Sequence, residues 1–407
     1  MSAHPHPRPV GGKLFDRTLI GLLAVFCVAG LVMLYRFFTG MGPVSNMTDG
    51  FTWGIWEPVN VVVFTGIGAG AFSTGLLCYL LNRGEYHPFV RPAVLLGAVA
   101  YSLAGASIIV ALGRYWNAYI LPWVPYWNLA SALLEVAICV MCYVCVLWVE
   151  VLPAVFDGAA MSTHSPGWSR WGKRWGARLD RAMPFIIALA IVLPAMHQSS
   201  LGGLMLIAGP KVHPLWHTAL LPTLFLISCL SMGYGAVVVL TTILNVSWNA
   251  LHDQKLFASM SKVNAGLIFL YAALRVGDIA VHGKLRYLGW NGYTALFLFE
   301  LALFLVAAFL FLSPRVQRNK GRLFGAALIG LAAGAVYRVD TYLGVYRPGP
   351  GWNYAPSIGE ITVTVGMAAI GAAVFLFVSR LFPVVVIEET RKHTHAGAGP
   401  HRAVAGR

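Results

Sequence analysis

Residues 134–151 have the sequence LEVAICVMCYVCVLWVEV, in which Glu135 and Glu150 are the charged side chains. Extended outward to residues 127–152, this apolar run exceeds the roughly 20 residues that an α-helix needs to cross a bilayer. The run therefore predicts a transmembrane helix.

Similar apolar runs recur along the chain. They occupy residues 18–38, 56–81, 91–112, 184–206, 215–246, 262–281, 293–313, 321–337 and 359–383. The run at 184–206 contains Pro194 and His197, which a membrane helix tolerates where neighbouring helices satisfy the freed polar groups. We expect an all-α integral membrane protein of about ten transmembrane helices. Its parts would be an N-terminal tail (1–17), a transmembrane domain (18–383) and a disordered C-terminal tail (384–407).

The composition argues against a soluble protein and against nucleic-acid binding. Hydrophobic residues make up 58% of the chain and charged residues 11%, whereas soluble domains carry about 25% charged residues. The net charge of +14 comes from Lys and Arg in short loops between apolar runs, so membrane lipid is the expected surrounding and no nucleic-acid partner is expected. All six Cys lie within apolar runs, where Cys acts as a small apolar residue. We expect no metal centre.

The basic residues predict the orientation. If the runs cross the membrane in turn, 21 of the 29 Lys and Arg residues lie on the side of the two termini and six lie on the other. Cytoplasmic loops carry the excess of Lys and Arg, so both termini are predicted to be cytoplasmic. The opposite loops are long and rich in Trp, Tyr, Gly and Pro. Long ordered loops usually carry function, and we expect this outer surface to dock a partner.

Ionisable residues inside a bilayer are costly and are candidates for function. Tyr101 lies near the middle of its span, and His197 and Glu135 lie in the outer halves of theirs, with Glu135 roughly 12 Å deep. Reduction of a quinone requires protons at two carbonyl oxygens, and an acid, a His and a Tyr are suitable donors. The alternative interpretation is a set of buried hydrogen-bonded pairs that fix helix packing.

A second candidate set lies at the start of the second span. Gly66, Gly68 and Gly70 would let a flat ring approach the backbone, and Asn60 could donate a hydrogen bond to a carbonyl. The alternative is ordinary packing of small residues between helices. A b-type haem would need two facing His ligands, and His197 and His217 lie at different predicted depths. We therefore expect no haem in this chain.

Several motifs resemble the NrfD/polysulfide-reductase family of membrane subunits, and within it the membrane subunits of periplasm-facing nickel–iron hydrogenases. They include TDGFTWGIW (48–56), YHPFVRPA (86–93), GRYWN (113–117) and MHQSS (196–200). The resemblance runs from about residue 11 to 385. It implies NrfD-like helical bundles in the bacterial cytoplasmic (inner) membrane and a quinone substrate, menaquinone or ubiquinone. It also implies a periplasmic ferredoxin-like iron–sulfur subunit and the hydrogenase large and small subunits as partners.

The resemblance assigns roles to individual residues. It places a proton path at Tyr101, Glu135 and His197, and a quinone pocket at Asn60, Gly66, Gly68, Gly70 and His197, with Arg114 at its mouth. Hydrogenase-type members can carry a further Glu in the helix after HPLW, where this chain has Leu240. Proton transfer through that point is in doubt, although Thr241 and Thr242 could hold waters.

Three other functions stay open from the sequence. The same quinone module could serve another periplasmic oxidoreductase. The broken span at 184–206 and the acids within the membrane also suit a secondary transporter, although no inverted repeat is visible. A passive membrane anchor would tolerate changes at Glu135 and His197.

Overall fold

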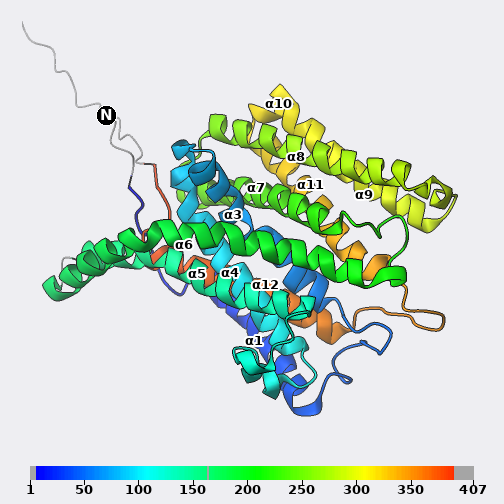
Figure 1. The fold of residues 1–407 in the computed structure, drawn as a ribbon. Helices are drawn as coiled ribbons and strands as arrows, with labels where there is room; N and C mark the ends of the chain where they lie inside the picture. Colours follow the sequence, from blue (N-terminus) through cyan, green and yellow to red (C-terminus); the bar gives the residue numbers. More distant parts are fainter. Residues whose placement is uncertain (1–5, 163–164, 389–407) are drawn as a thin grey trace, which may run out of the picture.

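The computed structural model describes residues 6–162 and 165–388. Within these ranges ten helices are long and apolar enough to cross a membrane, which confirms the predicted all-α fold and the predicted number of spans. Besides the helices, the described residues form three isolated β-bridges. Figure 1 shows the helices lying roughly side by side in one bundle, with the connecting loops at its two ends.

The first five spans are built from the following elements. They are α1 (Arg17–Thr39); η1 (Trp56–Val63), α2 (Phe64–Gly68), α3 (Gly70–Gly75) and η2 (Leu76–Leu80), which together form the second span; η3 (Gly84–Tyr86) and α4 (His87–Ala111); η4 (Tyr115–Ile120) and η5 (Val124–Tyr126) in the loop that follows; α5 (Ala132–Ala160); and α6 (Pro166–Ile207).

The last five spans follow the same pattern. They are built from η6 (Gly209–Lys211) and α7 (Leu221–Trp248), α8 (Gln254–Val281), η7 (Lys284–Tyr287) and α9 (Gly292–Leu312), α10 (Pro314–Gln317) and α11 (Lys320–Val339) with η8 (Asp340–Gly344), and α12 (Ile358–Leu381).

The bundle has two unlike ends. We call one the terminal face, because the described chain begins and ends there; it carries residues 6–16, 81–86, 249–253, 313–319 and 382–388. The other is the loop face, with residues 40–55, 112–131, 208–220, 282–291 and 345–357. Residues 384–388, predicted to be disordered, pair with the rest of the terminal face: Arg8 N donates to Val385 O at 3.0 Å and Leu251 N donates to Val386 O at 2.7 Å. The remainder of that predicted tail, 389–407, lies outside the described residues.

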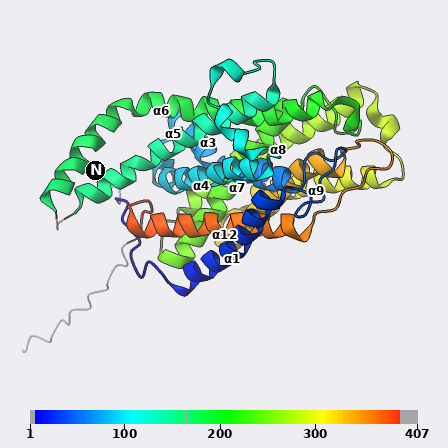
Figure 2. The same ribbon diagram turned by 90° about the horizontal axis from the view of Figure 1, so that it is seen from below.

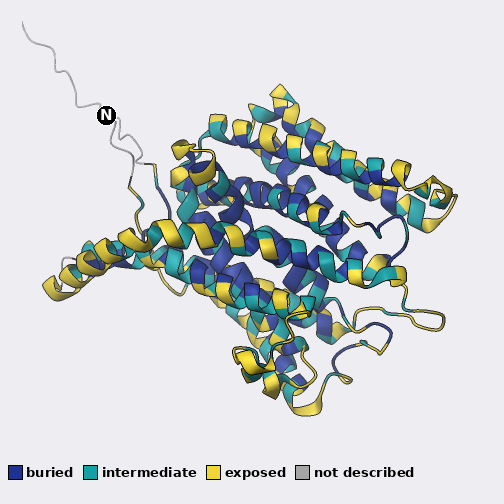
Figure 3. Cartoon of the chain, viewed as in Figure 1, coloured by how far each residue is buried: buried dark blue, intermediate teal, exposed yellow. Residues whose placement is uncertain are grey.

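The centre of the bundle consists of the second, third and sixth spans. In the most apolar part of Trp56–Leu80, 78% of the residues are buried, against 11% in α6. The helices α1 and α12 pair with each other and meet the centre mainly through α4 and η1, whereas α8, α9 and α11 pack together on another side. Figure 3 shows the buried residues concentrated in the middle of the bundle and the first turns of α6 mostly exposed.

The fifth span is not interrupted as its sequence suggests. α6 is one continuous helix of 42 residues, about 63 Å long at 1.5 Å per residue, and it passes through Pro194 without a break. Its basic first half, predicted to be a loop, is helical and projects with the end of α5 beyond the other helices at the terminal face (Figures 1 and 2). The second span is the irregular one, because π-helical turns at η1 and η2 flank its glycine-rich middle.

Adjacent glycines in α6 test how tightly it packs on α7. A Cβ atom at Gly202 would lie 2.7 Å from Pro222 Cα in the first turn of α7, whereas one at Gly203 would meet nothing within 4 Å. We expect Gly202→Ala to destabilise the protein by about 1–3 kcal/mol, because backbone atoms would have to move apart. Gly203→Ala should be neutral or stabilise by up to about 1 kcal/mol. Thermal unfolding in detergent measures both, and equal stability of the two variants would contradict this packing.

The loop face contains a pH-sensitive contact. The ring of His213 stacks on Tyr293 with centroids 4.4 Å apart, and its Nδ1 accepts a hydrogen bond from Leu215 N at 3.3 Å. Burial, and then the charge of Arg347, lowers the His213 pKa from 6.5 to about 4. The unfolded chain therefore binds a proton at a pH where the folded chain does not, and the free energy of unfolding falls as the pH drops from about 6.5 to about 4.

We expect this loss to be smaller in His213→Phe, which keeps an aromatic ring against Tyr293 and cannot titrate. Melting temperatures of both proteins between pH 7.5 and pH 4.5 provide the comparison. Identical pH dependence of wild type and variant would show that His213 does not contribute.

Candidate functional site

A buried polar cluster lies where α2, α4 and α6 meet. Gln198 Nε2 donates to the hydroxyl of Tyr101 at 3.2 Å and to the hydroxyl of Thr65 at 3.1 Å. All three side chains have no exposed surface. The cluster therefore joins one polar side chain from each of three separate spans. The sequence analysis noted Tyr101 as a candidate and missed Gln198 and Thr65, because nothing in the pattern of a single chain shows that they would meet.

His197 lies beside this cluster. Its ring contacts Tyr101 edge to face, with centroids 5.5 Å apart, and it is fully buried. Neither ring nitrogen has a hydrogen-bond partner, although the main chain of Val136 approaches the ring. Buried polar atoms are normally satisfied, so a ring with both nitrogens free is unusual and is suited to exchanging protons with a substrate or a water.

Glu135 is placed differently from its prediction. Helix α5 begins at Ala132 and not at 127, with Ser131 as its N-cap, so Glu135 lies in the first turn and is exposed. The predicted depth of roughly 12 Å was wrong, because residues 127–131 belong to the loop. Glu135 still contacts the helix that carries His197, since Ser200 Oγ donates to its Oε1 at 2.6 Å. The structure thus brings Glu135, His197 and Tyr101 to neighbouring positions on α5, α6 and α4.

Arg338 is buried next to the same helices. Its guanidinium has no exposed surface and donates to Val62 O at 3.1 Å and Phe225 O at 3.0 Å. Among the described residues no carboxylate pairs with it. Arg338 directly follows the predicted span at 321–337, and its burial could not be inferred from the apolar pattern. It also donates to the hydroxyl of Ser228 at 3.4 Å, and an arginine held by neutral acceptors provides a fixed positive charge in the interior.

The second-span residues predicted to form a quinone pocket are packed against other helices. Cβ atoms at Gly66, Gly68 and Gly70 would lie 2.9 Å from Met232 Sδ, 3.1 Å from Tyr101 Cδ2 and 3.1 Å from Val237 Cγ2 respectively. This close packing matches the alternative interpretation and leaves no slot for a flat ring at these three positions. Asn60 is fully buried, and neither its Oδ1 nor its Nδ2 has a partner. Asn60 remains available to a ligand or water.

Arg114 lies apart from the buried polar residues described above. It is exposed in the loop-face segment between α4 and α5, where it caps η4.

A cavity of about 460 Å³ lies between α1, α2, α4, α7 and α12. Its volume is within the range of small-molecule sites, roughly 300–1,000 Å³, but its lining is almost wholly apolar and includes Phe64, Leu103 and Leu240. None of the predicted site residues lines it. The hydroxyls of Thr241 and Thr242, predicted to hold waters, donate to carbonyls of their own helix, at 2.6 Å and 2.7 Å. The cavity suits hydrocarbon and offers nothing for proton transfer.

A second buried network stabilises the other half of the bundle. Glu300 of α9 accepts hydrogen bonds from Tyr271 at 2.7 Å and Trp216 at 2.9 Å, and pairs with Arg275 at 3.4 Å. The ion pair is almost completely buried. A carboxylate with three donors is fully satisfied, in contrast to His197 and Asn60. We assign this network to packing.

Together these features define a class: a multi-pass integral membrane protein that gathers groups able to exchange protons at the meeting point of its central helices. The chain belongs to the NrfD family, because the family model "Polysulphide reductase, NrfD" matches residues 43–340. This match confirms the resemblance seen in the sequence motifs.

Relatives of the chain are membrane subunits of redox complexes. It is 34% identical to the "Probable Ni/Fe-hydrogenase 2 b-type cytochrome subunit" of Escherichia coli, over 93% of this chain and 95% of the relative. It is 25% identical to the "Menaquinone reductase, integral membrane subunit" of Nitratidesulfovibrio vulgaris, over 88% and 90%. It is also 22% identical to a putative membrane subunit of dimethyl sulfoxide reductase from Halobacterium salinarum, over 90% and 91%.

One expectation is corrected by these relatives. The sequence analysis expected no haem, and the Escherichia coli relative is named a b-type cytochrome subunit. In the described residues His197 is a buried histidine with both ring nitrogens free. The next histidines along the chain, His213 and His217, lie in the loop-face connection to α7. No step of the proposed function depends on haem.

The hydrogen bonds of Gln198 predict its contribution to stability. Gln198→Leu would leave the hydroxyls of Tyr101 and Thr65 buried without their donor, and we expect a loss of about 1–3 kcal/mol. Ser199→Ala is the matched control, because the neighbouring Ser199 is half-buried and donates to the carbonyl of Met196 in its own helix. Thermal unfolding compares the variants, and a Gln198→Leu protein as stable as Ser199→Ala would argue against the network.

Proposed function

We propose that this chain is the quinone-reactive membrane subunit of a respiratory oxidoreductase complex, most specifically a nickel–iron hydrogenase. It would accept electrons from a ferredoxin-like iron–sulfur subunit docked at the loop face and deliver them to menaquinone or ubiquinone. The hydrogenase large and small subunits would complete the complex. The loop face would be periplasmic and the terminal face cytoplasmic, in the inner membrane of a bacterium.

One observation carries this proposal. The polar side chains of Tyr101, Gln198 and His197 meet in the interior of a membrane bundle, and the two nitrogens of His197 have no partner. The carboxylate of Glu300, by contrast, has three donors around it. A set with free nitrogens suits the delivery of protons to a substrate oxygen. The quinone substrate and the redox partner in this proposal are inferred from membership of the NrfD family and from the names of the relatives.

Each residue has a stated part in this proposal. Tyr101 and His197 would exchange protons with the reduced quinone, and Gln198 would hold the Tyr101 hydroxyl in position. Glu135 would connect the cluster to the loop face through Ser200. Arg338 would stabilise negative charge that develops nearby, since a fixed buried cation costs no reorganisation during the reaction.

A second candidate keeps the same site and changes the partner. The relatives include subunits named for menaquinone reductase and dimethyl sulfoxide reductase, so the electron donor could be an oxidoreductase other than a hydrogenase. The two candidates differ in the donor alone.

The complex purified with its partner subunits tests the function. We expect hydrogen-dependent reduction of a quinone analogue to fall about tenfold or more in His197→Ala, because a proton donor worth about that factor or more is lost. Glu135→Gln should lower it as well. Ser199→Ala, two residues from His197 and bonded only within its own helix, should retain wild-type activity.

A water-soluble dye that takes electrons before the membrane subunit is the control for an intact complex, and dye reduction should stay constant in every variant. Wild-type quinone reduction in His197→Ala and Glu135→Gln would assign both residues to packing. A wild-type complex that uses another reductant and not hydrogen would support the second candidate.

A further inference from the structure

Helix α5 carries a stripe of polar side chains that extends well below the candidate site. Glu135, Tyr143 and Glu150 are separated by eight and seven residues, so they lie on the same side of the helix. From Glu135 to Glu150 the helix advances about 22 Å, which is most of the roughly 30 Å thickness of the hydrocarbon core. The stripe thus leads from the loop face toward the terminal face.

Tyr143 joins the stripe to the site. Its ring meets Tyr101 edge to face with centroids 4.6 Å apart, and both residues are fully buried. The Tyr143 hydroxyl has no hydrogen-bond partner. A buried hydroxyl without a partner is costly, and its free donor and acceptor positions are available to a water.

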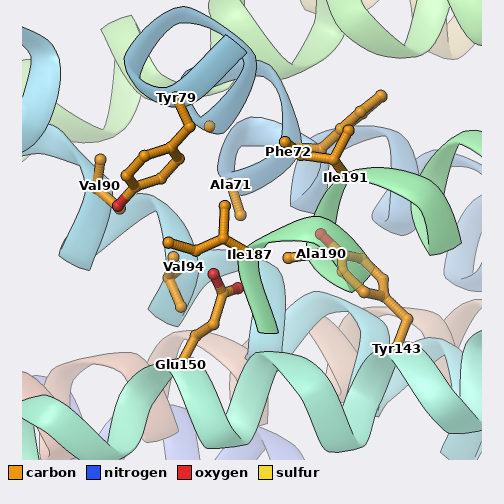
Figure 4. Close-up of a pocket in the computed structure, with 11 residues that line it drawn as sticks. Ala71, Phe72, Tyr79, Val90, Val94, Tyr143, Glu150, Ile187, Ala190 and Ile191 are labelled. Atoms are coloured by element: carbon orange, nitrogen blue, oxygen red, sulfur yellow. The ribbon is translucent and has the colours of Figure 1, made fainter. Parts of the chain in front are cut away.

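A small cavity lies between Tyr143 and Glu150. It has a volume of about 10 Å³ and is lined by Tyr143 and Glu150 of α5, Tyr79 of η2, and apolar residues of α3, α4 and α6. A space of this size holds about one water. Figure 4 shows Glu150 and Tyr143 extending from α5 into this space, with Tyr79 on the opposite wall. The cavity therefore bridges part of the two-turn gap between the Tyr143 hydroxyl and the Glu150 carboxyl.

Glu150 has a connection to the terminal face. It is half-buried, Tyr79 is 37% exposed, and the Tyr79 ring contacts that of His87, with centroids 5.8 Å apart. His87 is exposed at the first residue of α4. Tyr79 and His87 therefore lie between Glu150 and the terminal face.

Position 240 on α7, where the resemblance suggested that an acid could stand, holds an apolar residue in this chain. Leu240 faces the apolar cavity of about 460 Å³, and the neighbouring Thr241 and Thr242 hydroxyls donate within their own helix. No carboxylate is among the residues that line this cavity. The described residues place the acid on α5 instead.

We propose that Glu150 and Tyr143 form the terminal-face arm of a proton path that ends at Tyr101. This inference rests on the proposed function and adds the side of the membrane from which the protons come. Reduction of one quinone to quinol takes two electrons from the partner subunit and two protons. Each proton leaves Glu150 through the cavity water and Tyr143, and Glu150 regains a proton from the terminal face. Uptake on this side, with electrons entering at the loop face, moves charge across the membrane.

The test uses the complete complex in phospholipid vesicles, with a pH-sensitive dye in the compartment that the terminal face contacts. Hydrogen and a quinone analogue start the reaction. We expect Glu150→Gln and Tyr143→Phe to lower the number of protons taken from that compartment per quinone reduced to the passive leak. Glu150→Asp should restore part of the uptake.

Asp157→Asn is the matched control. Asp157 is a carboxylate on the same helix, two turns beyond Glu150, and is paired with Arg91 at 2.6 Å. This variant should keep the wild-type ratio. Wild-type proton uptake in both Glu150→Gln and Tyr143→Phe overturns the Glu150 path alone. A wild-type complex that reduces no quinone with any donor overturns the proposed function.

A second measurement does not depend on turnover. Dicyclohexylcarbodiimide is an apolar reagent that modifies protonated carboxyl groups within membranes, and peptide mass spectrometry locates the modified residue. We expect modification of Glu150 and not of Asp157, whose carboxylate is paired with arginine. Modification of Asp157 with Glu150 unmodified would count against a protonated Glu150 in the membrane.

Discussion

Burial of the Arg338 guanidinium is the constraint on which the packing of the central helices depends. Arginine keeps its charge in proteins, and a charge within hydrocarbon requires partners. The carbonyls of Val62 and Phe225 provide them, so the second span, α7 and α11 must meet at one depth. Gly66 makes the approach feasible, because a Cβ there would lie 3.3 Å from Arg338 Nε. The glycines of the second span serve this close packing.

The interior of the bundle has an apolar part and a polar part. Small residues allow α2 to pack closely against α4 and α7, and the apolar cavity lies between these helices and α1 and α12. The polar side chains lie on the other side, between α4, α5 and α6. Electrons and protons would therefore be handled on one side of α4 while hydrocarbon occupies the other.

The helical spans could be predicted from the sequence because a membrane demands a fixed length of apolar residues, and that length is visible in a single chain. The depth of a side chain in the membrane was predicted less accurately. The loop before α5 is apolar enough to resemble a membrane helix, so Glu135 was placed too deep. The candidates Tyr101 and His197 were found from residue type alone. Their partners Gln198 and Thr65, and the burial of Arg338, depend on which helices become neighbours, and hydropathy contains no such information. Pro194 suggested a break in a helix that is continuous, because packing outweighs a single lost hydrogen bond.

The pairing of α1 with α12 has a consequence for biogenesis. Among the described spans α1 is one of the least buried, and its main neighbour is α12, more than 300 residues later. Once inserted, α1 therefore stays without this neighbour until α12 has been synthesised. The backbone pairing of Arg8 with Val385 then joins the segments that flank the two helices. A chain truncated before α12 would leave α1 without its main contact.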